Sequence, residues 1–559
     1  MRKAKNNLCL IVFSVIIISI IYVLPIFHGG ILEGDDVVYH ITRFKSLCSQ
    51  FKLGNFHPLI YPEMLKEQGY ASGIFYPDYF FYPFAFLNLL GVKISLCFEL
   101  YYIIVNILTG LSFFFCSRAI FKDYDRVNCN FKAFVVFLLS IIDFYKLRNY
   151  YGRAALGEFT AMIFAPIVVL GIYYILKYGK KSYVLAFGMT GVLMCHILSF
   201  IMACMVLFIV CIYNFKQIIK TPGKLTMIIS AALQCGLISC FIWLPMLEML
   251  IKCDLTISHG AALFLKPIWK TYALKLGGYK TVGTLGLIAV LIYSILKNSP
   301  GHRIIQLMSF SLIFISDCFP WKLFGWCKPL TAIQFPWRFM SVFYFGVLFY
   351  LFLFVKSHSS KNISDYVKKM LFVVFTVFYI LLLSSSSLFG AEPWNKTIIA
   401  DEEISKIDDV GFLEYAPYEL SVFKKSKAHL DENNCYVLSE LMSISPDITG
   451  INGRKHIYIE KEVIKSGYRV KYTTEDNEII IPIINYPGYT ATLNNTKIKS
   501  IESDKYEFMK FRDIPNEGNI FIIYEGTVLQ HISLTISFFA TVISLLLVLA
   551  QRKKTRLSV

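Results

Sequence analysis

Long apolar runs recur along this chain, and they constrain its fold more than any other feature. A run of about 20 apolar residues matches the hydrocarbon core of a bilayer. Of the 559 residues, 56% are hydrophobic and 16% are aromatic, which excludes an ordinary soluble enzyme. The sequence therefore predicts a polytopic α-helical membrane protein, in which cysteines within the apolar runs pack as small hydrophobic residues.

About twelve segments are candidate membrane spans. They are residues 8–27, 96–121, 131–144, 159–176, 182–197, 200–215, 225–247, 282–296, 304–319, 339–355, 370–389 and 529–550. Lys and Arg gather at alternate ends of these runs, so the positive-inside rule explains the net charge of +17 and no nucleic-acid partner is implied. The first run lacks a small-residue cleavage site, which favours a retained helix. We therefore expect both termini in the cytoplasm.

This threading divides the chain into three parts. We expect a transmembrane domain over 1–389, an extracytoplasmic, mainly β domain over 390–528, and a final helix with a basic cytoplasmic tail over 529–559. The first outer loop is long, 28–95, and its apolar stretch 79–90 is too short to span, which indicates a helix lying in the membrane interface.

The β domain is predicted from alternating apolar residues and turn signals. The expected strands are 455–460, 467–473, 478–485, 505–511 and 519–524. Turns are expected at Asn452-Gly453, Pro487-Gly488 and Glu517-Gly518, and 392–429 is mixed with room for a helix. Together these segments predict a small β-sandwich before the last helix.

A polar cluster directly follows the first span. Asp36, His40 and Arg43 lie at i, i+4 and i+7, so they share one helix face, and Asp35 precedes them. Carboxylates beside a bilayer are costly and often functional, which favours a site for a charged, anionic substrate. The competing interpretation is a capped interfacial helix with solvated charges.

Other polar residues fall at the same predicted membrane surface. Arg153 offers an anion-binding donor, while Glu158 is also explained by the dipole of the helix it begins. His196 lies in an outer turn, where a satisfied interfacial histidine is the simpler interpretation. Gln334 and Arg338 lie on either side of a Phe-Pro-Trp segment. Either Arg338 binds a phosphate there, or the segment is an aromatic anchor at the membrane interface with Arg338 reaching to the polar side.

Several short motifs, in order, resemble one family. They are Gly34-Asp35-Asp36 with His40 and Arg43, Gly69-Tyr70, Phe75-Tyr76-Pro77, Tyr151-Gly152-Arg153 with Glu158, His196, Gln334-Phe335-Pro336-Trp337-Arg338, the segment 410–417, and Tyr486-Pro487-Gly488-Tyr489. This series resembles the bacterial YfhO-like membrane proteins, including relatives labelled 6-pyruvoyl-tetrahydropterin-synthase-related. That label implies no pterin chemistry here, because no span carries clustered histidines at zinc-ligand spacing.

The resemblance implies a GT-C glycosyltransferase architecture in a bacterial plasma membrane. Such an enzyme takes a sugar from a polyprenyl-phosphate donor in the membrane lipid and gives it to a cell-envelope glycan acceptor. Asp36 matches the family's first-loop aspartate, and Asp35 is an extra acid, so the base stays open between the two. No metal ligand set follows from the sequence, and a divalent cation between the two aspartates is left open.

The implied mechanism is an inverting displacement. Asp36 or Asp35 takes the acceptor proton, and Arg153, Arg338 or Arg43 holds the phosphate. His40, Glu158, His196 and Gln334 complete the substrate-binding set. Two rivals stay open: a flippase or transporter of lipid-linked glycans, which should carry ionisable residues at mid-membrane depth, and a non-catalytic scaffold for envelope assembly.

Overall fold

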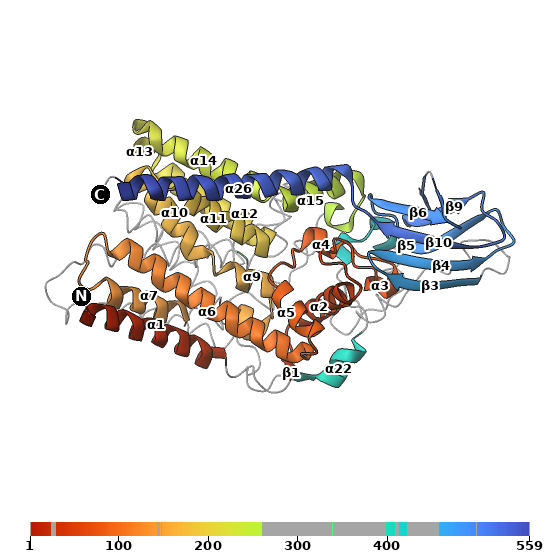
Figure 1. Cartoon of the computed structure of the whole chain (residues 1–559), viewed down its shortest axis with the longest axis horizontal. Helices are drawn as coiled ribbons and strands as arrows, with labels where there is room; N and C mark the ends of the chain where they lie inside the picture. The colour runs from red at the N-terminus through yellow and green to blue at the C-terminus, as the bar shows by residue number, and fades with distance from the viewer. Residues whose placement is uncertain are drawn as a thin grey trace, which may run out of the picture.

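The computed structural model consists of a helical region, a layer of short elements that follows the first helix, and two β-sheets (Figure 1). The structure describes residues 2–23, 30–141, 146, 148–259, 338, 398–407, 413–421, 458–498 and 500–557. Gln334 and the predicted spans 282–296, 304–319, 339–355 and 370–389 lie outside these residues.

The helical region is built from apolar helices that lie alongside one another (Figure 1). They are α1 (Arg2–Val23), α6 (Ile94–Phe121), α7 (Cys129–Ile141), α9 (Leu156–Ala161), α10 (Ala165–Tyr178), α11 (Ser182–Cys195), α12 (Ile197–Tyr213), α13 (Phe215–Lys220), α14 (Pro222–Ile238), α15 (Cys240–Lys252) and α26 (Val528–Leu557). Pro166 and Pro222 lie in the first turns of α10 and α14, where a missing N–H costs nothing. Gly179, at φ +60°, ends α10 in the left-handed conformation.

Among the described residues, three helical segments are long and apolar enough to cross a membrane: Ile94–Phe121, Leu156–Tyr178 and Val528–Ala550. The pair α14 and α15 would make a fourth, and α1, α7, α11 and α12 include shorter apolar helices. The predicted span 225–247 falls on this pair, and the chain bends by 70° between α14 and α15, so the segment is a broken span or a re-entrant loop rather than one straight helix. By length and composition these helices could span a membrane, which supports membrane association.

The layer that follows α1 consists of short elements of the predicted first loop. They are β1 (Gly30–Leu32), α2 (Val37–Lys52), α3 (Met64–Glu67), α4 (Ser72–Phe75) and α5 (Tyr82–Leu89). Helix α5 falls within the predicted interfacial segment 79–90, and Phe86 and Leu90 at its end are exposed. Phe51 packs edge-on against Tyr82 and contacts Phe86, so α2 and α5 share an aromatic core.

A distant segment completes this layer. Strand β2 (Ile398–Ala400) pairs antiparallel with β1 and leads into α22 (Asp401–Lys406), a helix in the mixed region 392–429. The Lys45 ammonium on α2 donates to the carbonyls of Ile404 and Ile407, at 3.1 and 2.7 Å. A cation beside the last carbonyls of a helix stabilises the C-terminal end of that helix. Lys45 therefore both stabilises the end of α22 and joins α22 to α2.

The β region forms two sheets around one core. Strands β3 (Tyr458–Ile464), β4 (Gly467–Thr473), β10 (Glu517–Tyr524), β6 (Tyr489–Leu493) and β7 (Thr496–Lys497) form one sheet in that order, and β5 (Glu478–Ile484), β9 (Phe508–Arg512) and β8 (Glu502–Ser503) form the other. Alternate residues such as Val470, Ile481 and Ile520 are buried between them, as period-two alternation requires. The predicted strand 467–473 is confirmed, whereas β6, β7 and β8 were not predicted. The predicted turn at Glu517-Gly518 is wrong, because both residues belong to β10.

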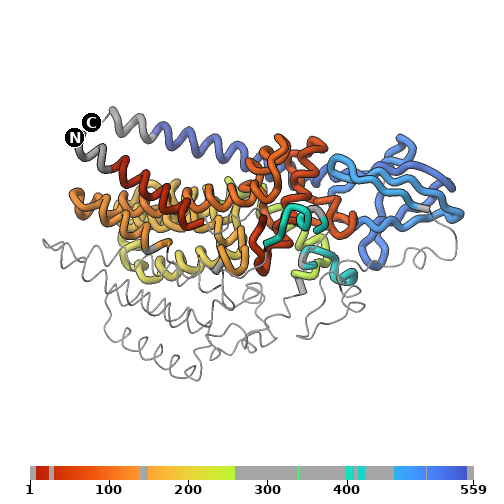
Figure 2. The backbone as a smooth tube through the Cα atoms, turned by 90° about the horizontal axis from the view of Figure 1, so that it is seen from below, coloured from red at the N-terminus to blue at the C-terminus, as the bar shows by residue number. Residues whose placement is uncertain are grey.

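The β region packs directly on the first-loop layer (Figure 2). The Tyr468 hydroxyl donates to the Pro62 carbonyl at 2.9 Å, and the Ile484 N–H donates to the Gln68 carbonyl at 2.8 Å. Since Ile484 and Phe508 are buried in the same core as the helices, the sheets are joined to the layer by apolar packing as well as hydrogen bonds.

Candidate functional site

Asp36 lies directly before helix α2, at the position where a side chain ordinarily caps a helix. Its carboxylate makes no capping hydrogen bond. It lies instead 3.3 Å from Nη2 of Arg153, while the Asp36 N–H donates to the Arg153 carbonyl at 2.8 Å. His40 and Arg43, farther along the same helix, are buried. The helix is confirmed, and the interpretation of a capped helix with solvated charges is wrong.

The segment that carries Arg153 has an unusual backbone. Residues Arg148–Gly152 form one π-helical turn, and Ala154 has a positive φ of 55°. Both features cost free energy and occur preferentially at functional sites. Gly34 permits the close approach of the preceding loop, because a Cβ there would lie 2.9 Å from the Ala154 Cβ. The fold thus presses two sequence-distant segments together to join Asp36 and Arg153.

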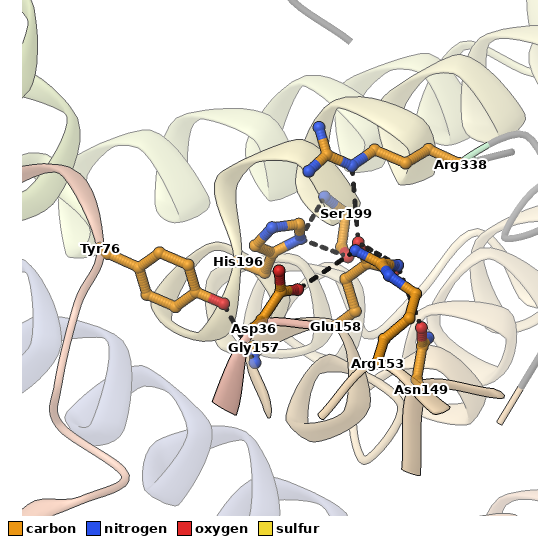
Figure 3. A network of polar contacts seen from close by, with 9 residues as sticks. All are labelled: Asp36, Tyr76, Asn149, Arg153, Gly157, Glu158, His196, Ser199 and Arg338. Atoms are coloured by element: carbon orange, nitrogen blue, oxygen red, sulfur yellow. Dashed lines mark hydrogen bonds and ion pairs between the residues drawn. The ribbon is translucent and has the colours of Figure 1, made fainter. Parts of the chain in front are cut away.

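Glu158 is held between two arginines (Figure 3). Its Oε1 lies 3.2 Å from Nη1 of Arg153 and 3.5 Å from Nε of Arg338. Arg153 also donates to the Asn149 side chain at 3.2 Å. Glu158 lies in the first turn of α9, as the dipole interpretation requires, but the two ion pairs go beyond it. The structure therefore joins Asp36, Arg153, Glu158 and Arg338 in one chain of charges.

Asp36 is the more accessible of the two carboxylates. Its side chain is 27% exposed, whereas that of Glu158 is 3% exposed. Burial raises the pKa of Asp36, Arg153 opposes that effect, and the negative charge of Glu158 reinforces it. A carboxylate with a raised pKa binds a proton more readily, so Asp36 suits a proton acceptor that a substrate can reach. Asp35, its exposed neighbour, makes no ion pair among the described residues.

Tyr76 lies at one side of the charged network (Figure 3) and was not predicted as a site residue. Its hydroxyl accepts the Gly157 N–H at 3.1 Å, and its ring lies 5.6 Å from that of His40 and 5.7 Å from that of His196. Gly157 leaves room for it, since a Cβ there would lie 2.2 Å from the hydroxyl oxygen. In the sequence, the signal for Tyr76 is the Phe75-Tyr76-Pro77 motif, which carries only part of the family resemblance.

Arg43 was predicted to bind substrate, but the structure pairs it with a buried acid. Its Nε lies 2.6 Å from Oδ1 of Asp78, and each side chain is only 3% exposed. The Tyr61 hydroxyl donates to the other Asp78 oxygen at 2.5 Å. The guanidinium also lies 4.1 Å from the centroid of the Tyr76 ring, a cation–π geometry. Arg43 therefore positions Tyr76, and this geometry gives it no direct contact with an accessible substrate.

The two histidines flank Tyr76 and are buried. His196 lies between α11 and α12, where its Nδ1 accepts the Ser199 N–H at 3.2 Å and so caps α12. This contact fits the interpretation of a satisfied interfacial histidine. Within the part of the chain that the structure describes, the Nδ1 of His40 has no hydrogen-bond partner. Burial, with the charges of Arg43 and His196, lowers the pKa of His40 well below its usual value. Both imidazoles are therefore neutral near pH 7.

Protonation of His196 is expected to oppose folding. Burial lowers its pKa from 6.5 to about 3, with Glu158 opposing and Arg338 assisting. As the pH falls below 6.5, the pKa of this histidine in the unfolded chain, the unfolded chain takes up a proton that the folded chain excludes. The free energy of unfolding therefore falls. We expect the thermal unfolding midpoint to drop as the pH falls from about 6.5 toward about 3. In His196→Gln, whose amide oxygen can still accept from Ser199, the drop should be shallower; an unchanged slope would contradict the assignment.

The described residues do not provide a set of metal ligands at this site. Across these ranges, no three side chains of His, Cys, Asp or Glu gather as metal ligands. A cation between Asp35 and Asp36 stays a prediction. Chemically, the site offers a carboxylate that can accept a proton and guanidinium groups that can pair with an anion.

Comparison with known proteins gives a partial match. No protein-family model matches the chain. The chain is similar to a protein of Lactococcus lactis subsp. cremoris (strain MG1363) named only "Uncharacterized protein", with 25% identity over 338 residues. The match covers 55% of this chain and 54% of the Lactococcus protein, so the chain spans about half the length of the relative it matches. The similarity extends over a large part of the chain and assigns no activity.

Proposed function

We propose that this protein is a membrane glycosyltransferase that moves a sugar from a polyprenyl-phosphate donor to a cell-envelope glycan by an inverting displacement. One observation carries the proposal: an accessible carboxylate, Asp36, is ion-paired to Arg153, which shares Glu158 with a second arginine, Arg338. A base beside two guanidinium groups is the minimal equipment for attack by a hydroxyl at a carbon that bears a phosphate.

Asp36 acts as the base. The acceptor hydroxyl gives its proton to the Asp36 carboxylate as its oxygen bonds to the anomeric carbon. The bond from that carbon to the phosphate oxygen breaks, and polyprenyl phosphate leaves with the electron pair. Because the two bonds form and break on opposite faces of the sugar, the anomeric configuration inverts. The exposure of Asp36 supports this role over the buried Glu158.

The arginines supply the counter-charge for the leaving phosphate. Arg153 and Arg338 present guanidinium groups that Asp36 and Glu158 hold in place. A phosphate at this position would compete with these carboxylates for the guanidinium N–H donors, which the ion pairs already hold in place. Tyr76, between His40 and His196, lies where it can fix the sugar ring by packing and by its hydroxyl.

The proposal includes a location. The apolar helices support a multi-pass protein of the bacterial plasma membrane, with about twelve spans when the predicted ones are included. The start of α1 and the end of α26 lie at the end of the helical region away from the β-sheets (Figure 1). This arrangement supports cytoplasmic termini and an extracytoplasmic β region. The exposed Phe86 and Leu90 support a lipid contact of the first-loop layer.

The deciding experiment gives purified protein in lipid nanodiscs a panel of radiolabelled polyprenyl-phosphate sugars and envelope glycans. We expect polyprenyl phosphate to be released and label to appear on the glycan with inverted configuration. In sealed vesicles, a transporter would instead move the lipid-linked sugar across the bilayer without breaking the sugar–phosphate bond. If donor stays intact with every sugar while vesicles show such movement, the transferase proposal is overturned.

A further inference from the structure

A hollow of about 590 Å³ lies on the outer face of the five-stranded sheet. This volume falls within the usual range for small-molecule sites. The lining side chains come from β3, β4, β10 and the turn between β6 and β7: Glu460, Glu462, Arg469, Lys471, Asn494, Asn495, Asn519 and Phe521. We call this set the sheet groove. It is separate from the Asp36 site, and nothing in the mechanism uses it.

The strand register explains why these side chains share a face. Glu462 lies opposite Arg469, which lies opposite Phe521, so an acid, a base and an aromatic ring form one row across three strands. In the next row, Glu460 lies opposite Lys471, which lies opposite Asn519. The alternate residues of β4 and β10 are buried between the sheets. The groove residues therefore point away from the core.

Asn494 and Asn495 form one end of the groove. Their positive φ angles of 46° and 69° identify the tight turn that joins β6 and β7, a conformation that asparagine tolerates. The Asn494 side chain accepts the Asn519 N–H at 3.1 Å and is thus fixed in place. The turn places a second amide, that of Asn495, on the groove.

Several polar groups of the groove are left available to a ligand. Glu462 and Arg469 pair at 3.1 Å, and Arg469 lies 5.4 Å from the centroid of the Phe521 ring. By contrast, Glu460 and Lys471 form no ion pair within the described residues although they are cross-strand partners. The side-chain amides of Asn495 and Asn519 likewise make no hydrogen bond to the described part of the chain. These exposed groups can therefore bond to a ligand without first breaking an internal pair.

We propose that the sheet groove binds an uncharged glycan chain, the acceptor of the transfer reaction. Carboxylate, ammonium and amide groups supply the mixed donors and acceptors that sugar hydroxyls need. Phe521 offers a flat apolar face for the C–H side of a sugar ring. With two acids and two bases the groove has no dominant charge, which disfavours a polyanion. Naming this glycan as the acceptor rests on the proposed function; the binding itself does not.

The test uses the full-length protein in nanodiscs and a panel of immobilised uncharged oligosaccharides, with poly(glycerol phosphate) as the charged comparison. We expect Arg469→Ala and Phe521→Ala each to weaken glycan binding by about tenfold or more. Arg512→Ala is the matched control: Arg469 and Arg512 are 53% and 55% exposed, and each pairs with an exposed glutamate. Because Arg512 lies on the other sheet, its replacement should leave binding unchanged.

The outcomes separate this inference from the proposed function. If no uncharged glycan binds, if poly(glycerol phosphate) binds better, or if Arg512→Ala weakens binding as much as Arg469→Ala, the glycan groove is refuted. With a polymeric acceptor, Phe521→Ala should raise KM and leave kcat unchanged. If Phe521→Ala transfers sugar with an unaltered KM, the proposed function stands and the glycan groove is refuted. If the protein binds glycan but never transfers sugar, the glycan groove stands and the proposed function is refuted.

Discussion

Replacement of Asp36 by asparagine is expected to lower kcat for sugar transfer by about 10²- to 10⁴-fold, the range for loss of a general base. Asparagine keeps the size of the side chain and an oxygen that can accept from Arg153 at the 3.3 Å position. It cannot take up a proton at neutral pH. The measurement is single-turnover release of polyprenyl phosphate by purified variants, which separates the chemical step from product release.

Asp35→Asn decides between the two adjacent acids. Asp35 is exposed and makes no ion pair among the described residues, so we expect this variant to keep most of the wild-type rate. Asp36→Glu should recover part of the activity, because a carboxylate is restored at a shifted position. If Asp35→Asn loses activity and Asp36→Asn does not, Asp35 is the base and the argument from burial and pairing is wrong.

The rate should also fall on the acid side of the pH profile. Burial raises the pKa of Asp36, so its reactive, deprotonated form is lost at a higher pH than for an ordinary aspartate. Arg153 opposes this shift. Removing its charge in Arg153→Gln should therefore raise the pKa further and move the acid limb of the profile to higher pH. A purely structural role for Arg153 would lower the rate without moving that limb.

Local patterns predicted the parts of the site that depend on a single helix. The spacing of Asp36, His40 and Arg43 predicted that they share one helix face, and α2 indeed begins directly after Asp36. This prediction succeeds because side-chain periodicity is set by the local backbone. The same holds for strand β4, whose alternation is complete within seven residues. The π-helical turn before Arg153 left no such local pattern, and the close approach of Gly34 to Arg153 and Ala154 is a contact between distant segments.

Contacts between distant segments could not be predicted from the sequence. The pairing of β1 with β2 joins residues more than 360 positions apart, and neither three-residue strand has enough alternation to be recognised. Asp78 directly precedes the apolar, aromatic stretch 79–90, which indicated only an interfacial helix. Nothing in its neighbourhood identified Arg43 as its partner, so Arg43 was assigned to substrate rather than to a buried ion pair.

That buried pair leads to the largest expected effect on stability. In Asp78→Asn, the guanidinium of Arg43 stays buried without a counter-charge, which typically costs 3–5 kcal/mol, that is, about 4 kcal/mol of the free energy of unfolding. In Arg43→Met, the buried carboxylate of Asp78 loses its counter-charge and keeps only the hydrogen bond from the Tyr61 hydroxyl. We expect both variants to unfold at markedly lower denaturant concentration in detergent micelles.

The double variant Arg43→Met with Asp78→Leu distinguishes the contribution of the ion pair from the cost of leaving either charge buried alone. Apolar side chains of similar volume remove both charges together, so much of the stability should return, because a buried ion pair barely exceeds its own desolvation cost. Arg512→Met, which breaks exposed pairs on β9, should cost only about 0–1 kcal/mol. Recovered stability without recovered transfer would show that Arg43 serves the site beyond stability, as expected if its guanidinium positions the Tyr76 ring. If the double variant is as unstable as the single ones, the two charges do not act as a pair.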